Sequence, residues 1–418
     1  MNVEQGPRPA PIRWAHSTTR ARFEKEQSAI MRDRNSVRPK PRPGKVSLRI
    51  SWITNKAAPY RLPVWEALGV ENDLEVVLLE DNERFLLDRG NRGSDWAVPH
   101  KSGGFRFREV GTRRIQRGEA QYFFGNGRKI LGPTRPEVVL LGGWESPAYF
   151  SALRRARSLS VPVVGFYEST LNSQRHTTGP IAWVRALFFR RLDAVVVPGV
   201  AAADALRKMG VEEDRIHIGF NAVDGHAIAR GANRARSILS KESAGHKFIF
   251  IGQLIERKNP LGLLDAFNDI SNLGDTLTVV GEGELEPELR DRCRADISLT
   301  GSIPYSEVPS KLAAHHTLVM PSHSEVWGLV ANEALAAGLH VVVSQESGVA
   351  PSILAMSGVF VTPTSRKELG EALARSRAEW TGPCPSPEIL RHGPEEFADT
   401  FADAFRSAVA QRRPNESS

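Results

Sequence analysis

Short apolar segments recur along the chain, and longer stretches with helical spacing separate them. Each segment is bounded by glycine, proline or polar residues, as is typical of strands in a parallel sheet that is buried on both faces. Residues 146–158 and 180–191 are examples of the helical stretches. The strands expected in the first half of the chain are residues 46–53, 74–79, 138–141, 161–166 and 194–198. Those expected in the second half are residues 247–251, 277–280, 297–300, 317–320 and 340–344.

This alternation of strands and helices predicts an α/β protein with two Rossmann-like domains, each built on a doubly wound parallel sheet, that face a central cleft. We expect a disordered basic leader rich in proline, an N-terminal domain, a linker with one helix, a C-terminal domain, and a last helix with a tail. The expected bounds of these parts are residues 1–45, 46–224, 225–246, 247–380 and 381–418. Because ligands of such sheets bind at the carboxyl ends of the strands, the loops that follow the strands should carry the chemistry.

Composition places the chain among soluble globular proteins. Of its 418 residues, 41% are hydrophobic and 25% are charged, and no apolar run approaches the roughly 18 residues that a membrane span needs. The net charge of +7 comes entirely from residues 1–45, which hold 11 Lys and Arg against 4 Asp and Glu. Nucleic acid is therefore not an expected partner of the neutral body, although a basic leader can attract nucleic acid or anionic lipid. The two cysteines, Cys293 and Cys384, lack paired spacing, so nothing requires an oxidising compartment and a cytoplasmic location is expected.

Three loops after strands of the second half have suggestive contents. Residues 252–260 contain a glycine that permits close approach, the cations Arg257 and Lys258, and a proline suited to the first turn of a helix. Such a loop suits a phosphate, and a solvated charged turn is the alternative. Residues 281–283 read Gly-Glu-Gly, which lacks the third glycine of the dinucleotide fingerprint, so NAD is not expected there. Gly301 lies in a turn that either meets a planar base or is a simple turn.

The loop and helix of residues 321–338 are the most informative segment. The helix is expected to begin near Gly328, with its free N–H groups and positive dipole end facing the cleft. Glu325 and Glu333 are eight residues apart, so on a helix they lie on a similar side, about 12 Å apart along the axis. Carboxylates suit the vicinal hydroxyls of a nucleotide sugar. The alternative is that Glu325 caps the helix and Glu333 is a surface residue.

Taken together, these motifs resemble the retaining glycosyltransferases of family four, which have the two-domain GT-B fold. The Glu325 and Glu333 pair, with Gly328 between them, looks like the family's E-x7-E motif. The other motifs follow in the family's order: residues 252–258 resemble its Gly-Arg-Leu…Lys phosphate loop, 281–283 its Gly-Asp-Gly, Gly301 its base-contacting turn, and 221–224 its Asn-Gly-Val-Asp. The resemblance covers roughly residues 46–365.

The resemblance implies roles for individual residues of the C-terminal, nucleotide-sugar domain. Glu325, binding the donor sugar, and Lys258, binding the pyrophosphate, are the expected catalytic residues, and Glu333 is expected to bind the ribose. The remaining expected donor-binding residues are Gly252, Gln253, Arg257, Gly301, Trp327, Gly328 and Leu329. A fixed cation and a helix N-terminus stabilise a departing diphosphate without a metal, so neither a metal site nor another cofactor is expected.

The sequence departs from the family pattern in places. Gln253 stands where the family usually has arginine, and Arg257 is the expected substitute for the lost charge. The family's Gly-Gly in the first strand–helix loop is replaced by residues 56–61, where Lys56 or Arg61 could meet an anionic acceptor. The expected acceptor or donor-sugar rim consists of Lys56, Arg61, Glu168 and Arg175.

The resemblance therefore implies a metal-independent hexosyltransferase that moves a sugar, with retention, from a UDP- or GDP-sugar to a glycan, lipid-linked or small-molecule acceptor on the N-terminal domain. Residues 182–191 combine aromatic residues with arginines, which suits either core packing or peripheral contact with the inner face of a membrane. The alternatives are a nucleotide-sugar epimerase or hydrolase on the same fold, or a non-catalytic binder of sugar nucleotides or nucleic acid.

Overall fold

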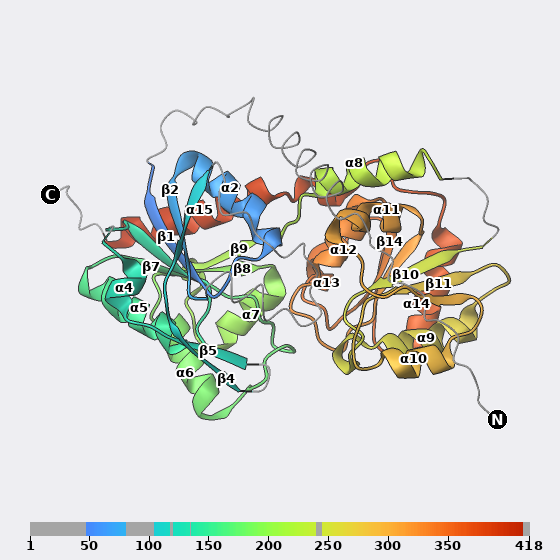
Figure 1. Cartoon of the computed structure of the whole chain (residues 1–418), viewed down its shortest axis with the longest axis horizontal. Helices are drawn as coiled ribbons and strands as arrows, with labels where there is room; N and C mark the ends of the chain where they lie inside the picture. Colours follow the sequence, from blue (N-terminus) through green and yellow to red (C-terminus); the bar gives the residue numbers. More distant parts are fainter. Residues whose placement is uncertain (1–46, 81–103, 118–119, 134, 240–244, 413–418) are drawn as a thin grey trace, which may run out of the picture. The chain divides into compact units, whose positions relative to one another are not determined.

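The computed structural model of the chain describes residues 47–80, 104–117, 120–133, 135–239 and 245–412 (Figure 1). The strands of the first half are β1 (Arg49–Thr54), β2 (Asp73–Leu78), β3 (Phe105–Glu109), β4 (Arg113–Arg117), β5 (Ala120–Phe124), β6 (Val138–Leu141), β7 (Val163–Phe166), β8 (Ala194–Pro198) and β9 (Ile216–Gly219). Its helices are η1 (Pro59–Arg61), α2 (Leu62–Glu71), α4 (Gly127–Leu131), α5 (Pro147–Ser158), α6 (Gly179–Phe189), α7 (Val200–Lys208) and η3 (Glu213–Arg215).

The second half contains a further set of alternating elements. Its strands are β10 (Lys247–Ile251), β11 (Thr276–Val280), β12 (Ile297–Leu299), β13 (Thr317–Met320), β14 (His340–Ser344) and β15 (Val359–Thr362). Its helices are α8 (Gly225–Arg236), η4 (Glu256–Lys258), α9 (Pro260–Ile270), α10 (Glu286–Arg292), η5 (Tyr305–Glu307), α11 (Val308–Ala313), α12 (Leu329–Ala336), α13 (Ala350–Ile353), α14 (Arg366–Glu379), η6 (Glu388–Arg391) and α15 (Pro394–Arg412).

Each half is built on one parallel sheet, which confirms the expected fold class. The first sheet has the strand order β3-β2-β1-β6-β7-β8-β9, and the second has the order β12-β11-β10-β13-β14-β15. Strands β4 and β5 form a separate antiparallel pair. In both sheets the order reverses beside the first strand, which is the arrangement of a doubly wound sheet.

Helices cover both faces of each sheet, so the strands are buried on both sides. In the first half, α2 and α15 cover the face that contains Trp52, while α5, α6 and α7 cover the face that contains Ile53. In the second half, α8, α11 and α12 pack on the face of Ile249, and α9 and α14 pack on the face of Phe250. This double burial explains why the central strands are continuously apolar in sequence.

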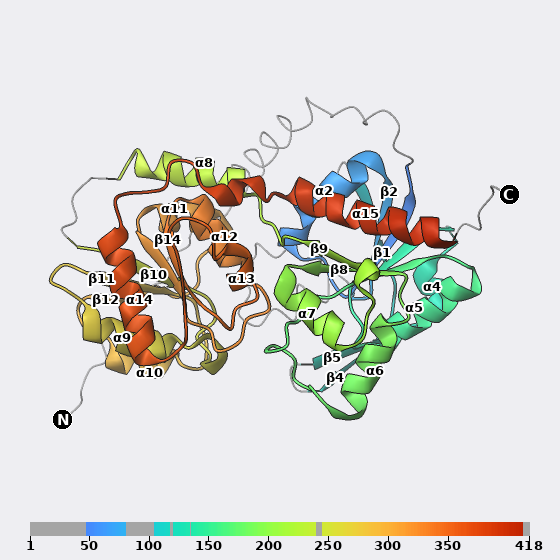
Figure 2. The same cartoon turned by 180° about the vertical axis from the view of Figure 1, so that it is seen from behind.

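The last helix of the chain, α15, packs against the first sheet rather than the second. Phe397, Phe401 and Phe405 are fully buried in the same cluster as Trp52 and α2. Figures 1 and 2 show α15 in red running alongside α2 in both views. The helix that precedes the second sheet, α8, packs against α11 of that sheet's covering layer. The expected basic leader, residues 1–45, lies outside the described residues.

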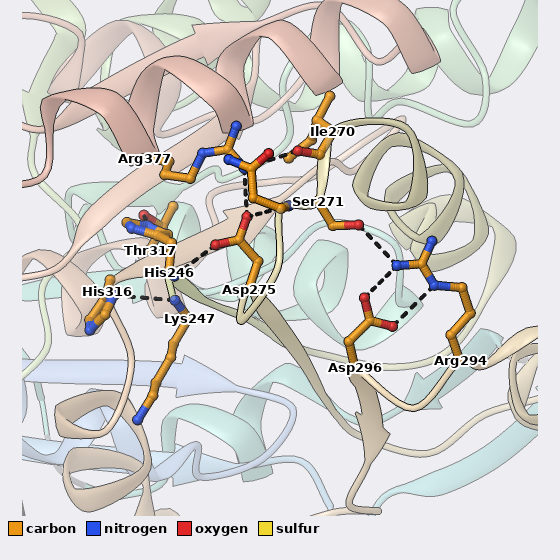
Figure 3. Close-up of polar contacts among 11 residues, drawn as sticks. His246, Lys247, Ile270, Ser271, Asp275, Arg294, Asp296, His316, Thr317 and Arg377 are labelled. Atoms are coloured by element: carbon orange, nitrogen blue, oxygen red, sulfur yellow. Dashed lines mark hydrogen bonds and ion pairs between the residues drawn. The ribbon is translucent and has the colours of Figure 1, made fainter. Parts of the chain in front are cut away.

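A polar network lies at the amino ends of the second sheet's strands (Figure 3). The Asp275 carboxylate accepts hydrogen bonds from Arg377 Nη1 (2.5 Å) and from the main-chain N–H of His246 (2.8 Å). The His246 ring contacts Thr317 Oγ1 and stands 4.9 Å from the His316 ring. Since this network is at the opposite end of the strands from the ligand-binding loops, we regard it as structural.

No helix within the described parts of the chain is long and apolar enough to cross a membrane.

Candidate active site

The second sheet reverses its strand order between β10 and β13. The loops that follow these strands bound the crevice in which doubly wound sheets bind ligands. Two hydrogen bonds join the loops: His323 N–H donates to Arg257 O (2.9 Å), and Asn259 Nδ2 donates to Pro321 O (3.2 Å). These hydrogen bonds fix the expected phosphate-binding loop, residues 252–260, to the loop that carries Glu325.

Lys258 and Glu325 meet at this reversal. The Lys258 ammonium contacts Glu325 Oε2 directly, and Arg257 Nη1 lies 3.8 Å from the same oxygen. The side chains of Lys258 and Glu325 are only 18% and 12% exposed. Burial, and then the positive charge of Arg257, lower the pKa of Lys258 to about 8. The site thus holds its cation beside a carboxylate and largely away from water.

Helix α12 begins directly after this pair. Gly328, its N-cap, has φ +103°, and a Cβ there would lie 2.5 Å from the Met320 Cε, so glycine is required at this position. Glu325 lies in the preceding loop, where its Oε1 accepts a hydrogen bond from Val326 N–H (3.1 Å). The helix thus begins near Gly328, as expected, and the left-handed turn there separates Glu325 from it, so the two carboxylates do not share one helix. The N–H groups of the first turn of α12 still come shortly after Glu325 in the chain.

Glu333 is buried in α12 with only 8% of its surface exposed, so it is not a surface residue. Burial raises the pKa of its carboxyl to about 7, and a hydrogen bond from the Tyr305 hydroxyl opposes this shift. Tyr305 follows the Gly301 turn directly. A buried carboxyl that accepts a hydrogen bond from a tyrosine next to the expected base-contacting turn is well suited to exchange that hydroxyl for those of a ligand.

The three glycine-containing loops interlock at the carboxyl edge of the sheet. Gly252 N–H donates to Val280 O (3.0 Å), and Gly281 N–H donates to Gly301 O (2.9 Å). A Cβ on Gly281 would stand 1.8 Å from Gly252 O, and one on Gly283 would stand 2.3 Å from Leu254 O. Close packing between loops thus explains the Gly-Glu-Gly motif, and the loops support one another below the crevice.

Other expected donor-binding residues have different surroundings. Gln253 is exposed, and Arg257 is 44% exposed with its Nη1 donating to Ser324 O (2.9 Å). Leu329 is partly buried in the first turn of α12. The Trp327 side chain is 2% exposed and packs edge-on against Phe220. The buried indole therefore leaves only the backbone of Trp327 to contact a ligand.

A buried hydrogen-bond chain joins the end of the first half to α12. The Trp327 indole N–H donates to Asn332 Oδ1 (3.2 Å), and Asn332 Nδ2 donates to Asn221 O (2.7 Å). Asn221 opens the segment that was expected to end the first domain, and Asp224 caps α8 by accepting from Ala227 N–H (2.8 Å). Sequence reasoning missed Asn332 and Tyr305. The position of Tyr305, directly after the glycine turn, was the only signal that could have indicated either residue.

The structure brings together three of the four expected rim residues. Arg61 and Glu168, 107 residues apart, form a 2.5 Å ion pair, and Lys56 lines the same pocket. This pocket, of about 310 Å³, lies at the carboxyl ends of β1, β6 and β7. Arg175 is exposed in the loop before α6 and is not among the described residues that line the pocket. A smaller pocket of about 160 Å³ is lined by residues from both halves, among them Asn172 and Glu346, which are hydrogen-bonded (2.7 Å).

Within the described ranges, no group of three or more His, Cys, Asp or Glu residues is arranged to hold a metal ion.

Two doubly wound domains, with a charged site at the strand reversal of the second, define the GT-B class of proteins. The family model "Glycosyl transferases group 1" matches residues 232–378, and the model "Glycosyl transferase 4-like domain" matches residues 65–221. Both models describe glycosyltransferases, and together they match most of residues 65–378.

The chain is also similar to individual relatives and solved structures. Glycogen synthase of Mycobacterium tuberculosis is 28% identical over 276 residues, which is 61% of this chain and 64%, just under two thirds, of that protein. The crystal structure of Anabaena HepE in complex with UDP has a TM-score of 0.59 at 14% identity, and the match covers 87% of this chain and 97% of that one. Sucrose-phosphate synthase from Thermosynechococcus elongatus has a TM-score of 0.61 at 16% identity, with 87% and 96% covered. At these identities the two structures show a shared fold.

Proposed function

We propose that this chain transfers a hexosyl unit, with retention of anomeric configuration, from a UDP- or GDP-sugar to a glycan, lipid-linked or small-molecule acceptor. The observation that carries the proposal is the meeting of Lys258 and Glu325 at the strand reversal, directly before the amino end of α12. A cation, a carboxylate and the backbone N–H groups at the amino end of a helix are the donors and acceptors that a sugar diphosphate requires. HepE, which shares this fold, has been crystallised with UDP and glucose, which supports a nucleotide-sugar donor.

The proposed chemistry is a displacement at the anomeric carbon. The bond from this carbon to the diphosphate oxygen breaks, the bond to the acceptor oxygen forms on the same face, and a departing phosphate oxygen takes the acceptor proton. Negative charge grows on the diphosphate, where the Lys258 ammonium and the N–H groups at the start of α12 stabilise it. Because these groups supply the stabilising charge, we propose that transfer is independent of metal ions and other cofactors.

The two carboxylates are proposed to hold the ends of the donor. Glu325 accepts hydrogen bonds from hydroxyls of the transferred sugar, and Glu333 accepts them from the ribose after displacing the Tyr305 hydroxyl. Gln253 and Arg257, both exposed beside the pair, are proposed to supply additional contacts to the phosphates. We also propose a cytoplasmic location, with peripheral membrane contact through Ile181 and Trp183 of α6, which are 46% and 65% exposed.

The direct test measures thermal stabilisation by UDP-, GDP- and ADP-sugars, with and without EDTA, followed by product analysis. We expect one nucleotide-sugar to raise the melting temperature regardless of EDTA, and Glu333→Gln to abolish the shift. The matched control is Glu371→Gln. Glu371 is 63% exposed on α14, and its ion pair with Lys367, at 3.9 Å, is a surface pair. No shift with any donor, or turnover without an acceptor, would contradict a transferase; the latter would favour a hydrolase or epimerase.

A further inference from the structure

The pocket of the first sheet lies where that sheet reverses its strand order. Strands β2 and β6 flank β1 on opposite sides, and the pocket is lined by Thr54 and Asn55 at the end of β1, and by Gly142 directly after β6. Its volume of about 310 Å³ is at the lower end of the range for small-molecule sites. It is thus the counterpart, in the first half, of the donor crevice in the second.

Arg61 contributes a buried guanidinium to this pocket. The residue is only 6% exposed, its Nη2 donates to Glu168 Oε1 (2.5 Å), and its Cζ lies 4.3 Å from the centre of the Phe166 ring. Among the residues that the structure describes, its Nη1 has no hydrogen-bond partner. An unsatisfied N–H on a buried cation is costly, because the desolvation of the charge is only partly compensated. The ion pair and the ring hold the guanidinium in one orientation and leave one donor nitrogen for a ligand.

A second unsatisfied donor belongs to Trp65, another residue of this pocket. Trp65 is 1% exposed, and no described residue accepts a hydrogen bond from its indole Nε1. Buried tryptophan N–H groups usually find an acceptor. Because both unpaired atoms are donors, a ligand with acceptor oxygens is the kind of group that satisfies them.

The charges that line the pocket point to a negatively charged ligand. They are the cations Lys56 and Arg61 and one carboxylate, Glu168, which accepts from Arg61 and, more distantly, from Asn221 Nδ2 (3.5 Å). The lining therefore has an excess positive charge. Trp52 and Phe166 supply apolar walls of the kind on which sugar rings pack.

We infer that this pocket binds an oxyanion, a phosphate or a carboxylate, carried by a sugar-sized acceptor, and that Arg61 is the residue that selects for it. The inference rests on the proposed glycosyltransferase function and names the class of acceptor. The Nη1 of Arg61 and the indole N–H of Trp65 donate to the oxyanion, and Glu168 acts as a positioning residue that fixes the guanidinium. An acceptor hydroxyl on the same molecule is the group that receives the sugar.

The test measures binding of glucose 6-phosphate, glucuronate, inorganic phosphate and glucose by calorimetry, without donor and at low and high salt. We expect glucose 6-phosphate or glucuronate to bind at least tenfold more tightly than glucose, and the difference to shrink at high salt. The first probe carries a phosphate and the second a carboxylate, so their comparison identifies the oxyanion. Inorganic phosphate binding as tightly as glucose 6-phosphate would contradict an acceptor site, and glucose binding as tightly as both would contradict an oxyanion site.

The variants separate this inference from a folding defect. Arg61→Gln is expected to weaken the anionic probe at least tenfold, and Arg61→Gln combined with Glu168→Gln avoids an unpaired carboxylate and should behave in the same way. The control is Arg207→Gln, which removes an exposed arginine of α7 in the same half. Binding of the nucleotide-sugar donor, on the other sheet, should stay within twofold of wild type in all of them. Undiminished probe binding in both Arg61 variants would overturn the inference.

The donor measurement also keeps the two proposals apart. If no nucleotide-sugar binds the wild-type protein while the anionic probes do, the proposed function fails, and the oxyanion pocket stands without its role as an acceptor site. If donors bind and sugar is transferred only to neutral acceptors, the function stands and this inference fails.

Discussion

The contact between Lys258 and Glu325 leads to different predictions for stability and for catalysis, because replacing both residues should restore stability but not activity. Both side chains are mostly buried, with 18% and 12% exposed. Removing one partner of a buried ion pair typically costs about 3–5 kcal/mol, since an uncompensated charge remains in the interior. We expect a value near the lower end, about 3 kcal/mol, for Lys258→Met, because Arg257 Nη1 is 3.8 Å from Glu325 and partly compensates it.

Replacing both partners should restore most of that stability. Lys258→Met with Glu325→Gln leaves no buried charge, so the double variant should lie within about 1 kcal/mol of wild type. The cycle therefore predicts a coupling free energy of about 2 kcal/mol or more. The same cycle on the exposed pair Lys367 and Glu371, 3.9 Å apart with 86% and 63% exposed, should give a coupling within error of zero.

The assay combines denaturant unfolding, followed by tryptophan fluorescence, with initial rates of sugar transfer. Lys258→Met, Glu325→Gln and the double variant should each lose at least a hundredfold in rate, although the double variant regains stability. The variants of the surface pair should keep wild-type rates. A coupling below about 0.5 kcal/mol would mean that the ion pair does not form in solution. A stable double variant that still transfers sugar would refute the catalytic roles of both residues.

Further predictions follow from buried polar groups. Burial raises the pKa of Glu333 to about 7, and the ionised form is the one that accepts ribose hydroxyls. The dissociation constant of the donor, measured by calorimetry, should therefore rise about tenfold from pH 8 to pH 6. The variant Glu333→Gln should bind the donor weakly at both pH values. Burial lowers the pKa of His246 to about 3 and that of His316 to about 4. Because the unfolded chain binds protons to these rings first, the free energy of unfolding should fall by about 1.4 kcal/mol per pH unit for each ring below about pH 6.5, and it should not depend on them above that pH. An NMR titration that shows either ring charged in the folded protein at pH 6 would contradict this. Asn332→Ala leaves an indole N–H and a carbonyl unpaired and should lower the unfolding free energy by about 2–4 kcal/mol, which denaturation measures.

The central strands could be predicted because burial on both faces demands uninterrupted apolar residues. Residues 138–141, 194–198 and 247–251 were expected with the bounds that β6, β8 and β10 have. Strand β3 was missed because it lacks a continuous apolar run: it lies at the edge of its sheet, and its sequence alternates arginine with apolar residues. Arg106 and Arg108 pair with carboxylates of the neighbouring β2, at 2.8 and 3.0 Å, and only the sheet register discloses these partners.

The sequence located the loops of the candidate site more reliably than their geometry. The glycine at 328 indicated a helix start, but only its left-handed conformation explains why Glu325 stands outside the helix. The approach of Arg61 to Glu168 across 107 residues follows from strand order, which spacing along the chain does not encode. The unpaired nitrogens of Arg61 and Trp65 depend on atomic packing and leave no signal in the sequence.

The two strand reversals share one construction, and this similarity suggests how the two substrates are handled. In each sheet a cation from the loop after the first strand, Lys258 or Arg61, contacts a carboxylate from beyond the reversal, Glu325 or Glu168. The difference lies in freedom of movement. A lysine ammonium on a flexible stem can leave Glu325 and follow charge as it grows on a departing diphosphate. Arg61 is held between Glu168 and the Phe166 ring, so it presents a fixed donor suited to an oxyanion whose charge does not change during transfer.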